Sequence, residues 1–213
     1  QFKQAVWAHE QGRNVAVRWY EQAPDSLDAQ LAYLRSSEAL GEALMKSGRK
    51  SEARRFIAEG ADLATSYCEA SPTVDAFANL ARCLCTLGDM HRAFGEFEQA
   101  QTAYDEMCTA SVKLTELEPD NAQWLNGRSA DFERLGDLQM ALKNYPKARD
   151  YYEESLRFAE EYVAGDPTNL FRLQESTWSY QKLANVCKSQ GDTEREAWSR
   201  KKLAEIRRTL KGG

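Results

Sequence analysis

Apolar side chains recur every three to four residues over most of this 213-residue chain, which is the spacing of one face of an α-helix. Leu80, Leu84, Leu87 and Gly88 show the pattern clearly. Five prolines and twelve glycines leave room for long uninterrupted helices. The sequence therefore predicts an all-α protein.

Three series of markers return along the chain with a period of 47 to 48 residues. The first is a leucine followed by a small residue and a polar residue, at 40–42, 87–89, 135–137 and 183–185. The second lies twelve residues after the small residue, at Ala53, Ala100, Ala148 and, where the pattern degrades, Glu196. The third is proline, at Pro24, Pro72, Pro119 and Pro167. Such a period is typical of helical repeat arrays.

Each repeat is predicted to be a hairpin of two helices. The turn between the helices is expected near Gly48, Gly95, Asn144 and Gly191. The prolines close each unit, and polar residues after them can cap the next helix: Asp25 or Ser26, Thr73, Asp120 or Asn121, and Thr168 or Asn169. The small residues Gly41, Gly88, Gly136 and Ala184 let the two helices approach closely, with the alanines of the second series filling the contact.

The segments Leu87-Gly88…Ala100…Tyr104 and Leu135-Gly136…Ala148…Tyr152 resemble the tetratricopeptide-repeat signature of Leu-Gly, then Ala, then an aromatic residue. The resemblance implies a right-handed superhelical solenoid of antiparallel helix hairpins, with about four and a half repeats. Because the family repeat has about 34 residues, both helices of each hairpin must be longer here. Similar long repeats occur in large bacterial signalling proteins, fused to kinase, NTPase or peptidase modules.

We expect one domain spanning residues 1–213. It starts with a half repeat, the second helix only, at 1–25, followed by repeats at 26–72, 73–119, 120–167 and 168–213. The chain is expected to begin mid-repeat and to be a fragment of a longer protein, because Phe2-Lys3-Gln4-Ala5 resembles residues 97–100. Its N-terminal edge is then a candidate surface for self-association.

Charge and composition argue against nucleic-acid binding, a membrane span and catalysis. A net charge of −5 argues against a nucleic-acid partner, although residues 194–213 carry seven Lys or Arg against three Glu. No run of apolar residues is long enough to span a membrane, and the five cysteines lie in helix-like segments, as expected of a cytoplasmic protein. His9 and His91 are predicted to be packing residues, and no motif for catalysis, a metal or a cofactor is present.

The first helix of each repeat is expected to line a concave groove that binds a partner protein. The positions facing the groove have a 3-4-3 spacing and include Arg35, Glu38, Glu42, Arg82, Asp89, Arg92, Glu133, Asp137, Trp178, Gln181, Asn185 and Lys188. Stacked repeats would align the polar residues that follow the small ones into an acidic stripe. Such a stripe favours a partner segment rich in Lys or Arg.

The sequence therefore predicts a non-enzymatic scaffold for protein–protein interaction, with no cofactor. Two alternatives remain open. The chain could be a regulatory arm that docks on a kinase, NTPase or peptidase domain of the same protein. It could also be a structural element that self-associates through the N-terminal edge or the basic C-terminal helix.

Overall fold

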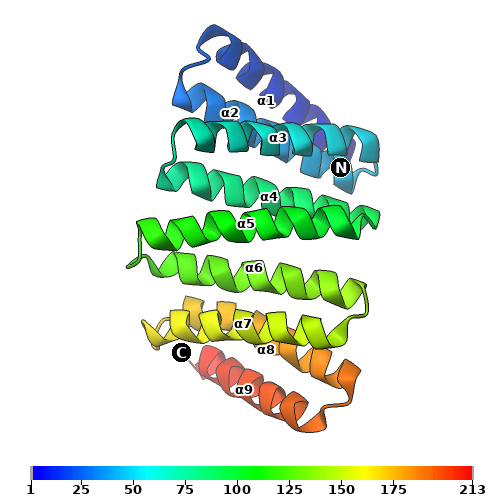
Figure 1. Ribbon diagram of the computed structural model, residues 1–213, viewed down its shortest axis with the longest axis vertical. Coiled ribbons are helices and arrows are strands. Elements are labelled where there is room, and N and C mark those ends of the chain that lie inside the picture. The colour runs from blue at the N-terminus through cyan, green and yellow to red at the C-terminus, as the bar shows by residue number, and fades with distance from the viewer. Residues whose placement is uncertain (1, 213) are drawn as a thin grey trace. The chain divides into compact units, whose positions relative to one another are not determined.

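The computed structural model describes residues 2–212, and these residues form nine α-helices and no β-strand (Figure 1). The all-α prediction is confirmed. Gln1 and Gly213, the end residues of the predicted domain, lie outside the described residues. The helices are α1 (Phe2–Gln22), α2 (Leu27–Lys46), α3 (Lys50–Ala70), α4 (Val74–Phe94), α5 (Phe97–Leu117), α6 (Ala122–Ala141), α7 (Tyr145–Ala164), α8 (Leu170–Gln190) and α9 (Thr193–Gly212).

The helices belong to two compact units, Gln1–Ala110 and Ser111–Gly213, with the division inside α5. In the first unit, α2 packs against α1, α3 and α4. In the second, α7 packs against α6 and α8, α8 packs against α9, and α6 also contacts α8. In each unit, therefore, the first helices of two hairpins are neighbours. These first helices begin at residues 27, 74, 122 and 170, which are 47, 48 and 48 residues apart.

The polar residues after the closing prolines cap the first helices. The side chains of Ser26 and Thr73 accept hydrogen bonds from the backbone N–H groups three residues later, at 3.4 and 3.3 Å. Asn121 and Asn169 accept from the N–H groups two residues later, at 3.0 and 3.1 Å. Each cap satisfies a backbone donor that has no partner within its helix. At the three positions where two cap residues are predicted, the second of the two caps the helix: Ser26, Asn121 and Asn169.

The turn inside each hairpin needs a residue in the left-handed backbone region. Gly48, Gly95 and Gly191 supply it in three hairpins, with φ between 75° and 79°. In the remaining hairpin the left-handed residue is Lys143, with φ of 59°, one position before the expected Asn144. Asn144 instead caps α7 through the backbone N–H of Lys147. A side chain in this backbone region is strained by about 1–2 kcal/mol.

The small residues of the repeat lie where two helices meet, but alanine does not fill the space above them. A Cβ atom added to Gly136 would lie 2.6 Å from Cδ1 of Tyr152, and one added to Gly88 would lie 2.5 Å from Cδ1 of Tyr104. At Gly41 the corresponding neighbour is Ile57. The side chain over each glycine therefore comes from four residues after the alanine, because one further helical turn brings it onto the same face.

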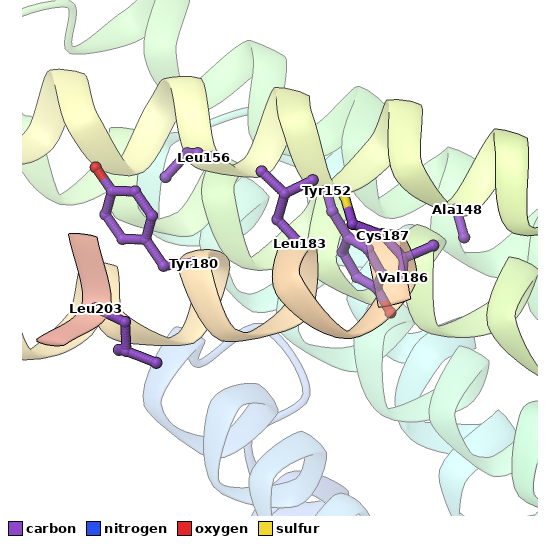
Figure 2. Packing of buried hydrophobic residues seen from close by; sticks show 8 residues of the cluster. All are labelled: Ala148, Tyr152, Leu156, Tyr180, Leu183, Val186, Cys187 and Leu203. Atoms are coloured by element: carbon purple, nitrogen blue, oxygen red, sulfur yellow. The ribbon is translucent and has the colours of Figure 1, made fainter. Parts of the chain in front are cut away.

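The core of the second unit lies between α7, α8 and α9. Figure 2 shows its side chains meeting between the helices: Ala148, Tyr152, Leu156, Tyr180, Leu183, Val186, Cys187 and Leu203. Three buried serines beside this core, Ser129, Ser155 and Ser179, bond to one another across α6, α7 and α8 at 2.9 to 3.2 Å. Because these polar groups satisfy one another, they can be buried at little cost.

Helix α1 packs on α2 through Val6 and Ala16, which are both buried. Trp7 and Trp19 are 64% and 45% exposed. The prediction that His9 is a packing residue is wrong, because His9 lies on the exposed side of the helix. His91 is half-buried, with Nδ1 2.7 Å from Oε2 of Glu96.

Candidate functional site

The candidate surface starts from the exposed face of α2. Arg35 and Glu42 lie on this face and are both exposed. Glu42 approaches Lys46 of the same helix at 3.7 Å, and both side chains stay about half exposed or more. An ion pair of this kind in water contributes little to stability. The Glu42 carboxylate is therefore accessible to a partner.

Glu38, also predicted to face the partner, lies instead in the contact between α2 and α4. It is 5% exposed, forms an ion pair with Arg82, and accepts a hydrogen bond from Oγ1 of Thr86 at 2.8 Å. Arg82 also donates to Oδ1 of Asn79 at 3.1 Å. Glu38 thus joins two neighbouring first helices and orients Arg82, whose side chain is 41% exposed.

Asp89 on α4 is held by the second helix of its own hairpin. The Tyr104 hydroxyl donates to Oδ1 of Asp89 at 2.6 Å, and Nε of Arg92 lies 3.3 Å from the Tyr104 oxygen. Burial raises the pKa of the Tyr104 hydroxyl, and the nearby Asp89 charge raises it further. Tyr104 therefore stays a neutral donor, and Asp89 is fixed in position.

Asp137 on α6 has the same arrangement in the second unit. The Tyr152 hydroxyl donates to Oδ1 of Asp137 at 2.6 Å, and Nζ of Lys182 on α8 lies 2.7 Å from Oδ2. One turn away, Glu133 accepts from the Ser179 hydroxyl at 2.9 Å, and burial raises the pKa of its carboxyl group. Lys182 and Ser179 thus bind α8 to α6 through carboxylates predicted to face the partner.

The outer face of α8 has few such internal bonds. Trp178 is 56% exposed, which is unusual for so large an apolar side chain. Gln181 donates to Oδ1 of Asn185 at 3.1 Å along the same face, and Lys188 is exposed. An exposed tryptophan among hydrogen-bonding groups is the type of residue that anchors protein interfaces.

The predicted acidic stripe is therefore not a row of free carboxylates. Glu42 is accessible, whereas Asp89 and Asp137 are already bonded to a tyrosine and lie near a cation. In each unit the first helices present charged side chains held in fixed positions. Alignment of the stripe along the whole chain stays a prediction.

Sequence reasoning missed the role of the two tyrosines. The repeat signature places Tyr104 and Tyr152 in the packing between helices, but their hydroxyl groups also orient the carboxylates of the first helices. The signal was present: each tyrosine lies 15 residues after its aspartate in both repeats. Lys182 had no comparable signal, because its contact depends on the packing of α8 against α6.

The described residues also bear on two other features, a metal site and a membrane-spanning helix. Within residues 2–212, no group of three His, Cys, Asp or Glu side chains is placed to hold a metal ion. In the same part of the chain, no helix has the length and hydropathy needed to cross a lipid bilayer.

Comparisons with known proteins agree with this geometry. Residues 132–162, which include the Gly136–Tyr152 contact, match the tetratricopeptide-repeat family model. No curated protein matches the sequence. Among solved structures, a putative kinesin light chain from Podosopora anserina with TPR-like repeats has a TM-score of 0.66 at 16% identity, covering 100% of this chain and 90% of that one.

Two further structures show the same fold. BtubC from P. vanneervenii has a TM-score of 0.57 at 14% identity and covers 100% of this chain and 93% of its own. MamA has a TM-score of 0.51 at 15% identity and covers 100% and 92%. At these identities the similarity shows the fold alone, and it confirms the predicted helical-repeat solenoid class. Residues 132–162 thus match one tetratricopeptide repeat, and the chain has the fold of solenoids with TPR-like repeats.

Proposed function

We propose that this chain is a protein-binding scaffold whose first helices bind a segment of a partner protein. A fold of stacked helix hairpins supports this role, because it presents an extended surface built from successive first helices. The observation that carries the proposal is the Asp–Tyr arrangement, which fixes charged side chains on a first helix in both units. Binding then costs less conformational entropy, since these side chains are already ordered. We also propose that the repeats which form this scaffold span residues 26–72, 73–119, 120–167 and 168–213.

The proposed partner segment combines basic and apolar residues. Glu42 supplies an accessible negative charge in the first unit. In the second unit, Trp178 supplies an apolar surface with Gln181 beside it for hydrogen bonds to a peptide backbone. Asp137, bonded to Tyr152 and Lys182, can also accept a hydrogen bond from the partner, because a carboxylate has about four lone-pair sites. The alternative role as a regulatory arm of an enzyme stays a prediction.

A labelled peptide of alternating Lys and Leu tests the proposal by fluorescence anisotropy. Trp178→Ala should weaken binding about tenfold, the usual effect of losing an interface tryptophan. Trp7→Ala is the matched control, because Trp7 is similarly exposed but lies on α1, a second helix in the repeat scheme. Its affinity for the peptide should match that of the unmodified chain.

A second pair of variants tests the charge. Glu42→Lys should weaken binding of the Lys–Leu peptide several-fold, with a smaller difference at high salt because screening reduces the charge term. Glu106→Lys, an exposed position on the second helix α5, should have little effect. Equal losses in Glu42→Lys and Glu106→Lys would mean that net charge, rather than the first-helix surface, governs binding.

A further inference from the structure

The basic C-terminal helix forms one side of an open cleft in the second unit. The cleft has a volume of about 300 Å³ and is lined by Gln181 from α8 and by Arg200, Leu203, Ala204, Arg207, Arg208 and Lys211 from α9. Leu203 is 4% exposed and belongs to the core between α7, α8 and α9, whereas the four cations and Ala204 are exposed. The cleft thus combines an apolar residue at its base with positive charge around it.

Among the described residues, one of these four cations has an acidic partner and the other three have none. Arg200 pairs with Glu196 at 2.8 Å. Within residues 2–212, no carboxylate lies within ion-pair distance of Arg207, Arg208 or Lys211. The helix dipole favours a cation in the last turn of a helix, and of these three residues only Lys211 lies in the last turn of α9. The dipole therefore does not stabilise the charges of Arg207 and Arg208. Repulsion among the unpaired cations would be relieved by an anionic ligand.

We propose that the cleft between α8 and α9 binds an acidic segment of a partner protein. Complementary charge attracts such a segment, and Leu203 and Ala204 offer contact to an apolar side chain within it. Arg200 and Lys211 are eleven residues apart, which corresponds to about 16 Å along a helix. An extended segment of about five residues covers this length.

A peptide fits the cleft better than a nucleic acid. Single-stranded nucleic acids are bound by stacking successive bases on aromatic side chains, whereas the residues lining this cleft include no aromatic ring. The chain as a whole is also acidic, with a net charge of −5, so a longer phosphate backbone would meet repulsion outside the cleft.

This cleft shares Gln181 with the first-helix surface of the proposed function, but its cations all lie on α9, and the two surfaces have opposite charge preferences. The first-helix surface is proposed to bind a basic peptide, and the cleft an acidic one. Loss of one activity therefore leaves the other measurable. The probe for the cleft is a short labelled peptide of alternating Glu and Leu, measured by fluorescence anisotropy with the full chain.

Arg207→Glu is expected to weaken binding of the Glu–Leu peptide about tenfold, because it removes one attraction and adds a repulsion of similar size. Lys202→Glu is the matched control, since it makes the same charge change on α9 at a residue outside the cleft, 3.7 Å from Glu205. This control should stay within about twofold of the unmodified chain. Arg208→Glu provides a second cleft variant in case Arg207→Glu does not fold, as judged by circular dichroism.

Three results would overturn the proposal. One is an equal loss of affinity in the cleft variants and in Lys202→Glu, which would indicate attraction to the whole helix rather than to the cleft. Another is equal or tighter binding of a short single-stranded DNA than of the Glu–Leu peptide. The third is no binding of the Glu–Leu peptide by the unmodified chain at low salt.

Discussion

Replacing Gly136 with alanine is expected to destabilise the second unit, although alanine is the better helix former. The new Cβ atom would lie 2.6 Å from Cδ1 and 2.9 Å from Cζ of Tyr152. The ring is 2% exposed, and its hydroxyl is bonded to Asp137 at 2.6 Å, so it cannot move aside freely. Overpacking of this kind costs about 1–3 kcal/mol. The gain in helix propensity offsets about 0.5–1 kcal/mol, which leaves a net loss of up to about 2.5 kcal/mol.

Gly127 provides the matched control within the same helix. It lies in α6, and a Cβ atom added there would meet nothing within 4 Å. Gly127→Ala should therefore increase the free energy of unfolding by about 0.5–1 kcal/mol. Urea unfolding followed by circular dichroism compares the two variants, provided that each unfolds in a single transition. The same substitution in one helix is thus predicted to have opposite effects.

Equal stabilisation by Gly136→Ala and Gly127→Ala would refute the close-packing explanation for the glycine of the repeat. A second variant locates the effect. If the ring causes the loss, combining Gly136→Ala with Tyr152→Leu should cost less than the sum of the two single changes. Strict additivity would mean that the added methyl group is resisted by something other than Tyr152.

Three further predictions concern the second unit. Lys143→Gly should raise the free energy of unfolding by about 1 kcal/mol, because it relieves the left-handed backbone at φ of 59°, and an unchanged urea midpoint would contradict this. Tyr152→Phe should lower the free energy of unfolding by about 1–3 kcal/mol, because Asp137 loses a hydrogen bond to its charged carboxylate. An unchanged free energy of unfolding in urea would contradict a stabilising role for this bond. Burial raises the pKa of Asp131 from 3.8 to about 6, so the folded state retains the proton more strongly than the unfolded state, and stability falls as pH rises between these values. At about 1.4 kcal/mol per pH unit, the free energy of unfolding falls by about 3 kcal/mol over this range. Asp131→Asn should abolish this part of the pH dependence in urea midpoints measured from about pH 4 to 7. An unchanged slope of the midpoint against pH in Asp131→Asn would contradict the prediction.

The fold was largely predictable because its determinants are local and repeated. The prolines and the polar caps act within a few residues of their own position, and the Leu-Gly markers act within one hairpin, on a side chain 16 residues later, so their meaning can be deduced from spacing alone. Lys143 was not predictable as the left-handed residue, because nothing in a lysine indicates that backbone region. The exposure of His9 depends on which face of α1 packs against α2, and the repeat pattern of the other hairpins did not reveal it.

The candidate site was predicted only in part, because it depends on contacts between helices. Spacing placed Glu42 and Trp178 on the faces of first helices, and both side chains are exposed. Spacing could not show that Glu38 is buried against Arg82, since that contact requires the packing of α2 on α4. The excess of positive charge near the C-terminus was evident in the sequence. The cleft beside it was not, because α8 and α9 together form its walls.

Photo-cross-linking tests the central claim most directly. A Lys–Leu peptide carrying a photoreactive group would be bound to the chain and irradiated, and the sites of attachment would be identified by mass spectrometry. The account predicts attachment on the exposed faces of the first helices, near Glu42 on α2 and Trp178 on α8. Attachment confined to the second helices α3, α5 and α7 would contradict it.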